Sequence, residues 1–71
     1  PDRLAIRRTL AGQYQLAGRD EEAVAQWDEV GNRLLEENDQ DGALQAIRAI
    51  IQLNPPNVTD YHQLLAELES R

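Results

Sequence analysis

Cysteine, methionine, phenylalanine and lysine are absent from the 71 residues, and aromatic side chains make up only 4% of them. Without cysteine the chain has no disulfide, no thiolate nucleophile and no cysteine-ligated zinc site. A single histidine also excludes a multi-histidine metal site. So short a chain buries a small share of its surface, and with few aromatic side chains we expect a thin core and a marginal fold.

Positive charge is scarce as well, since seven arginines stand against thirteen carboxylates and give a net charge of −6. Nucleic acid and anionic membranes both need a basic surface, so neither is an expected partner. No apolar run approaches the ~18 residues of a membrane span, and no signal segment is present. These absences favour a cytoplasmic protein. Because the chain begins with Pro1 and has no methionine, we expect one domain, residues 1–71, excised from a longer protein.

Apolar residues recur every three or four positions along the chain, which predicts an all-α fold. We expect four helices, at about residues 3–17, 21–37, 41–53 and 58–70. Gly18 permits a left-handed helix end, and Asp20 is expected to cap the second helix. Pro55 and Pro56 end the third helix. Because the links are short, neighbouring helices are expected to be antiparallel.

Two features of these helices suggest how they pack. The apolar stripe of the first helix is expected to be buried and consists of Ile6, Leu10, Ala11, Tyr14 and Ala17. Gly31 has no side chain to hold two helices apart, so we expect a close helix–helix approach there.

A pattern of aromatic, small and proline positions spans the second and third predicted helices. Its members are Trp27, Val30, Gly31, Leu34, Ala43, Ile47 and Pro55. The spacing resembles that of the tetratricopeptide repeat family, whose unit is a helix–turn–helix pair. Tyr61 follows Trp27 by the length of one such unit, about 34 residues. The resemblance implies about two repeats, with these two rings in equivalent positions of successive helical hairpins.

A second frame, shifted by little more than half a repeat, fits the same family. It uses Leu10, Ala11, Tyr14, Gly18, Ala23 and Trp27. The second helix is then either the second helix of one repeat or the first helix of the next. The frame that contains Trp27, Gly31 and Pro55 together is preferred, and the choice decides which helices line the concave face.

Members of this family stack antiparallel helix pairs into a right-handed superhelix whose concave groove binds peptides or helices of other proteins. The resemblance therefore implies a non-catalytic interaction module without a cofactor or metal, and with a protein or peptide partner. In the preferred frame, the candidate contact residues are Ala25, Asp28, Asn32, Leu35, Thr59, His62, Ala66 and Glu69. The alternative is a structural end segment of a longer array, or a surface that pairs with a second copy of the chain.

Other chemistry finds little support in the residues. His62 has no catalytic partner at helical spacing, and the four glycines are too dispersed to cradle a phosphate. Residues 37–42 resemble the start of a calcium loop, but its twelfth position, which needs a bidentate glutamate, holds Arg48. An arginine cluster (Arg3, Arg7 and Arg8) and a strongly acidic second helix remain, and these are either solvated faces or a surface for a basic or amphipathic segment.

Overall fold

Four helices follow one another along the chain in a computed structural model that describes residues 3–70. They are α1 (Arg3–Leu16), α2 (Asp20–Glu36), α3 (Gln40–Gln52) and α4 (Val58–Glu69). Within this range there is no strand. The all-helical prediction is therefore confirmed, and each boundary falls within one residue of the expected position or on it.

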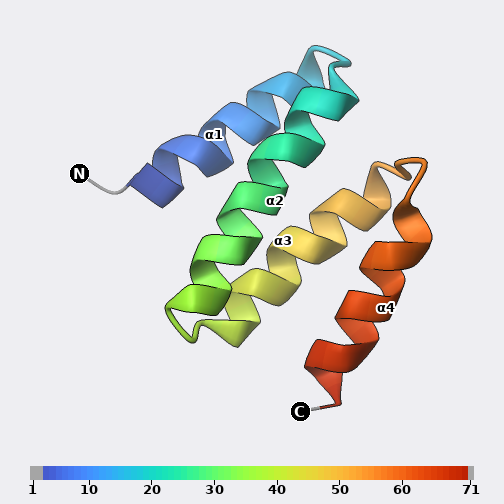
Figure 1. Cartoon of the computed structure of the whole chain (residues 1–71). Helices are drawn as coiled ribbons and strands as arrows, with labels where there is room; N and C mark the ends of the chain where they lie inside the picture. Colours follow the sequence, from blue (N-terminus) through green and yellow to red (C-terminus); the bar gives the residue numbers. More distant parts are fainter. Residues whose placement is uncertain (1–2, 71) are drawn as a thin grey trace.

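The helices form a single layer. Each described helix packs on its neighbours in the chain, α1 on α2, α2 on α3 and α3 on α4. The arrangement is flat, since its extents are 34 × 32 × 12 Å. Successive helices run in opposite directions, as Figure 1 shows, and consequently α2 and α4 begin at the same edge of the layer.

The second residue of each turn between helices lies in the left-handed region. These residues are Gly18, with a φ of 75°, Asn38, with 62°, and Asn54, with 52°. After α1 and α2, the amide of the left-handed residue and the amide of the residue that follows it donate to carbonyls of the last helical turn, as in a Schellman motif. After α3, Asn54 makes the first of these bonds, but Pro55 has no N–H for the second. Gly18 was predicted to end its helix in this way, whereas the two asparagines were not.

The left-handed backbone at Asn38 should make stability sensitive to the side chain there. Alanine has no polar group to compensate for this conformation, so Asn38→Ala is expected to lower the free energy of unfolding by about 1 kcal/mol. Asn38→Gly should leave it unchanged or raise it by a few tenths, because glycine adopts this φ without a steric cost. Urea unfolding followed by circular dichroism tests both variants, and equal midpoints would contradict the expectation.

The helix starts differ in how they are capped. At α3, the Asp39 carboxylate accepts a hydrogen bond from the Gly42 amide at 3.0 Å. A Cβ atom on Gly42 would lie 2.8 Å from that carboxylate and 3.0 Å from Leu34 Cδ1, so a side chain there would displace the Asp39 carboxylate from its present position. The prediction that Asp20 caps α2 is wrong, because the cap position is Arg19 and Asp20 is the first helical residue. Its carboxylate still favours the helix through the helix dipole.

The core is small and contains many alanines. Ala23, Val30, Leu34, Ala43, Ala46, Ile47, Ile50 and Leu68 are buried, together with Ala11. Val30, Leu34, Ala43 and Ala46 form a cluster between α2 and α3, against which Trp27, Leu4 and Leu35 pack. Gly31 is also buried, and a Cβ atom there would lie 3.6 Å from Ala46 Cβ. The close approach expected at Gly31 is thus an approach between α2 and α3.

The predicted stripe of α1 is only partly buried. Ala11 is fully buried, and Leu10 and Tyr14 are half-buried. Ile6 is 62% exposed and Ala17 is exposed, so the prediction is wrong for these two residues. The reason is geometric: α1 stands at the edge of the layer and packs only on α2, so one helix cannot cover the whole stripe.

Candidate functional site

The candidate contact residues come from two helices that flank α3. Among those of α2, Ala25, Asp28 and Asn32 are exposed, while Leu35 is half-buried against the core cluster. All four candidates on α4 (Thr59, His62, Ala66 and Glu69) are exposed. Leu35 therefore contributes more to packing than its expected place on the solvent side implied.

A side-chain contact joins α2 to α4. The Tyr61 hydroxyl donates a long hydrogen bond to Oδ1 of Asp28, at 3.5 Å. No two Cα atoms of these helices come within 8 Å in the described chain, so the contact is made by side chains that reach across α3. It brings one predicted residue, Asp28, next to the helix that carries four others. We call the surface formed by the seven exposed candidates and Tyr61 the α2/α4 surface.

This contact changes the acidity of Tyr61. Burial raises the pKa of the Tyr61 hydroxyl, and the negative charge of Asp28 raises it further. The hydrogen bond with the Asn57 side chain acts in the opposite direction and is outweighed. Because the folded protein holds this proton more tightly than the unfolded chain, Tyr61 contributes stability that is complete below the ordinary tyrosine pKa of about 10. That contribution is lost as the pH rises through the higher folded value.

The free energy of unfolding should therefore fall above about pH 10. The chain has no lysine or cysteine, so neither residue type contributes to a decline above about pH 10. Tyr61→Phe should flatten the decline in that range. Tyr14→Phe, which leaves the Asp28 contact intact, should keep it. Urea unfolding at a series of pH values measures both, and an equally steep decline in Tyr61→Phe would contradict the proposed cause.

Two side-chain hydrogen bonds join the C-terminal end of α4 to α3. Arg48 donates to a carboxylate oxygen of Glu69 at 2.9 Å, and the Gln40 side chain donates to the backbone carbonyl of Leu68. Glu69 is about half exposed, but its charge already has a partner. Among the candidate residues of α4, Thr59, His62 and Ala66 are therefore more accessible to a ligand.

Trp27 and Tyr61 do not share one environment. Both rings are half-buried, but the Trp27 indole N–H donates to Oε1 of Gln15 on α1 at 2.9 Å, whereas Tyr61 reaches Asp28 on α2. The expected equivalence of the two rings would give them corresponding partners. The polar partner of Trp27 lies on the helix that precedes it, whereas the polar partner of Tyr61 lies two helices before its own. The two rings therefore give no support to the repeat assignment.

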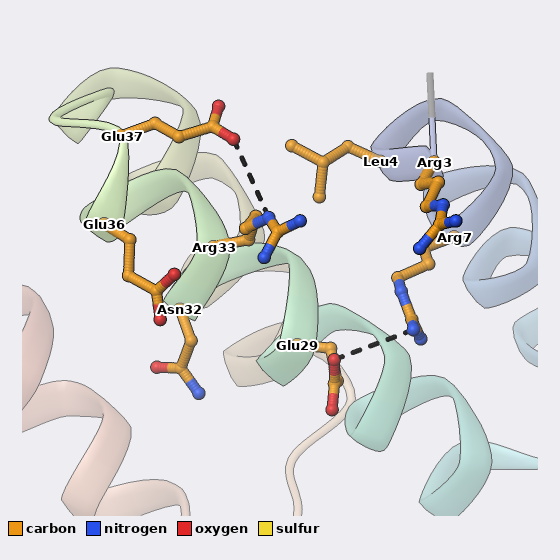
Figure 2. Close-up of a pocket in the computed structure, with 8 residues that line it drawn as sticks. All are labelled: Arg3, Leu4, Arg7, Glu29, Asn32, Arg33, Glu36 and Glu37. Carbon is orange, nitrogen blue, oxygen red and sulfur yellow. Dashed lines mark ion pairs between the residues drawn. The ribbon is translucent and has the colours of Figure 1, made fainter. Parts of the chain in front are cut away.

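A polar groove of about 640 Å³ separates the N-terminal part of α1 from the C-terminal part of α2. Figure 2 shows its lining: Arg3, Leu4, Arg7, Glu29, Asn32, Arg33, Glu36 and Glu37. The Arg7 guanidinium lies 3.9 Å from the Glu29 carboxylate, and it donates a hydrogen bond to Oε1 of Gln26 at 3.2 Å. Nε of Arg33 lies 3.7 Å from the Glu37 carboxylate. These pairs are half exposed, so each contributes little to stability.

The residues of this groove could be found from the sequence but not placed together by it. Glu29, Arg33 and Glu37 follow one another at intervals of four, a spacing that puts them on one face of α2. The basic cluster of α1 was also apparent. Its proximity to that face depends on how α1 crosses α2, which periodicity does not specify. Arg7 thus contacts side chains of α2 from α1, while Asn32 borders both the groove and the α2/α4 surface.

His62 and the hydroxyl side chains of the described residues form no hydrogen bond with one another. His62 is exposed, and within residues 3–70 it makes no hydrogen bond to a hydroxyl or carboxylate. Thr9 and Ser70 donate to backbone carbonyls of their own helices. The same residues include no group of three or more histidine, aspartate or glutamate side chains arranged to hold a metal ion. None of the four described helices is long and apolar enough to cross a membrane.

Comparison of the chain with protein-family models, with curated proteins and with solved structures finds no match. The interpretation of the α2/α4 surface therefore depends on its own geometry.

Proposed function

We propose that this chain is a non-catalytic protein–protein interaction module that binds a peptide or helix of a partner on the α2/α4 surface. The proposal includes a tetratricopeptide-like stacking of about two repeats with a right-handed superhelical twist. The observation that carries it is the contact between Tyr61 and Asp28, because it brings side chains of α2 and α4 together on one side of a thin layer of helices.

Exposure and charge also support this interpretation. Asp28 and Asn32 on α2, and His62 on α4, offer hydrogen-bonding groups to a ligand. The Tyr61 ring beside them is half-buried, and a rigid, amphipathic side chain of this kind is a frequent anchor in protein interfaces. A thin layer also leaves both of its faces accessible, so a partner can bind without displacing a helix.

A panel of peptides can test the proposal. The chain is used to select binders from a displayed library of random peptides, and affinities of the selected peptides are measured by calorimetry. Asp28→Arg combined with Asn32→Ala should weaken binding by about tenfold, or ~1.4 kcal/mol, and leave the helical circular dichroism unchanged. Glu67→Arg, an exposed charge reversal on α4 outside the α2/α4 surface, should stay within about twofold.

Two outcomes would contradict the interaction module. One is that no peptide is enriched over a control without protein. The other is that the selected peptides bind the double variant as tightly as the parent chain, which would place their site elsewhere.

A second candidate function is a structural one, in which α1 packs on a second copy or on a neighbouring repeat. The observation in its favour is the exposure of two large apolar side chains on α1, Ile6 at 62% and Leu16 at 91%. Sedimentation equilibrium over a concentration series distinguishes it, because self-association through α1 should disappear in Ile6→Gln combined with Leu16→Gln.

A further inference from the structure

A recess of about 270 Å³ lies where α2 begins and the turn between α3 and α4 passes beside it. We call it the proline recess, and its lining consists of Asp20, Glu21, Val24, Leu53, Asn54, Pro55, Pro56 and Asn57. It has the size for one long side chain rather than for a folded element. The sequence patterns did not indicate it, because its two walls come from segments far apart in the chain, the start of α2 and the turn after α3.

One part of the recess is apolar and rigid. Val24 and Leu53 are half-buried, Pro55 is buried, and Pro56 is exposed beside them. Two consecutive prolines fix the backbone φ angles of this wall, so a ligand meets a surface that is already formed. A preformed wall lowers the entropy lost on binding.

The rim of the recess is negatively charged. Asp20 and Glu21 are exposed and make no ion pair within the described residues, whereas the neighbouring Glu22 is paired with Arg19. The N-terminus of α2 contributes about half a positive charge at this point, which two free carboxylates outweigh. The recess is therefore a site for a cation with an apolar stem, and both arginine and lysine side chains have this form.

The proline recess is continuous with the α2/α4 surface. Val24 lies one helical turn before Asp28 on α2, and Asn57 lies one turn before Tyr61 on α4. Asn57 also bonds to Tyr61 through its side chain. A segment that crosses the Asp28–Tyr61 contact can therefore place its next side chains in the recess.

We propose that the proline recess binds an arginine or lysine side chain of the partner segment, with its stem on Val24 and the prolines and its charged head between Asp20 and Glu21. This inference rests on the proposed function, and it specifies the partner as a basic segment with apolar residues beside the cation. The negative charge of the rim disfavours an acidic segment.

Two synthetic peptides test the recess without knowledge of the natural partner. The probe is acetyl-Leu-Arg-Leu-amide, and its control replaces arginine with citrulline, which has nearly the same shape but no charge. In a titration followed by amide chemical shifts, the arginine peptide should shift Glu21, Val24 and Leu53. The citrulline peptide should bind about fivefold more weakly, since its uncharged side chain forms no ion pair with Asp20 or Glu21. Equal binding of the two peptides, or shifts confined to other residues, would overturn the proposal.

Two double variants distinguish attraction by the two carboxylates of the recess from attraction by the net charge of the chain. Asp20→Asn combined with Glu21→Gln should reduce binding of the arginine peptide by about fivefold and leave the citrulline peptide unaffected. Glu36→Gln combined with Glu37→Gln removes the same charge at the opposite end of α2 and should change binding by less than about twofold. Equal losses in both double variants would overturn the proposal, because the attraction would then come from the net charge.

The failure of this inference can be told from the failure of the proposed function. If selected peptides bind the parent chain, lose affinity in the Asp28 and Asn32 variant and show no effect of Asp20 and Glu21, the recess is wrong and the interaction module stands. If no peptide binds at all, both are wrong. If the arginine peptide binds only by dissociating a dimer seen in sedimentation, the occupant is a second copy and the basic partner segment is wrong.

Discussion

Replacing Ile50 with alanine is expected to remove a large part of the free energy of unfolding, about 2–5 kcal/mol. Ile50 is 1% exposed and is among the largest fully buried side chains. Truncation of such a residue costs about 2–5 kcal/mol, because it loses burial and leaves a cavity. A domain of 71 residues has a total stability of roughly 4–11 kcal/mol, so this loss is a large part of it.

Ile51→Ala is the matched control for this prediction. It is the same substitution one position further along α3, with the same change in helix propensity, but Ile51 is only half-buried. Its cost should be about 1 kcal/mol or less, since fewer atoms leave the core. Thermal unfolding by circular dichroism should give a midpoint for Ile50→Ala that is lower by at least about 10 °C than that of Ile51→Ala. Similar midpoints would contradict the stabilising role assigned to the burial of Ile50.

Two substitutions of Gly31 should change the free energy of unfolding in opposite directions. Gly31→Ala is expected to raise the free energy of unfolding by up to about 1 kcal/mol, because alanine is the better helix former. The structure has space for it, since the new Cβ would lie in ordinary contact with Ala46, at 3.6 Å. Gly31→Leu has to fit three further carbon atoms into the same buried interface, and overpacking of this kind costs about 1–3 kcal/mol.

Urea unfolding of the two Gly31 variants tests this pair directly. The order leucine, parent, alanine in increasing midpoint is the expected result. A leucine variant as stable as the parent would show that α2 and α3 can separate without cost, and the close approach of these helices would then have no role in stability.

The helices could be predicted from the sequence because their causes are local. The repeat of apolar residues, Gly18 and the two consecutive prolines each act within a few residues of the helix that they define. The left-handed conformation of Asn38 and Asn54 was harder to predict, because asparagine is found in many conformations. Only its place after the last helical turn requires a positive φ. The cap of α2 was predicted at Asp20, one residue after its observed position at Arg19. Arg19 makes no side-chain capping hydrogen bond, so the sequence carries no capping signal at that position.

The candidate site was predictable only in its parts. Periodicity identified the exposed faces of α2 and α4, and these contain Asp28 and His62 as expected. The contact between Asp28 and Tyr61 and the proline recess depend on how the helices cross, which no local pattern encodes. The exposure of Ile6 has the same origin, because a helical stripe indicates which residues are apolar but not how many neighbours are present to cover them.

The single-layer arrangement has a consequence for how the chain reaches its folded state. Helices that pack only on their sequence neighbours bring together segments separated by one short turn, so the average contact spans little of the chain. Loops of this length close rapidly and at low entropic cost, which favours folding in microseconds to milliseconds. The end helices α1 and α4 each pack on a single helix, apart from the Tyr61–Asp28 contact, and can then detach and reattach while the α2–α3 pair stays intact.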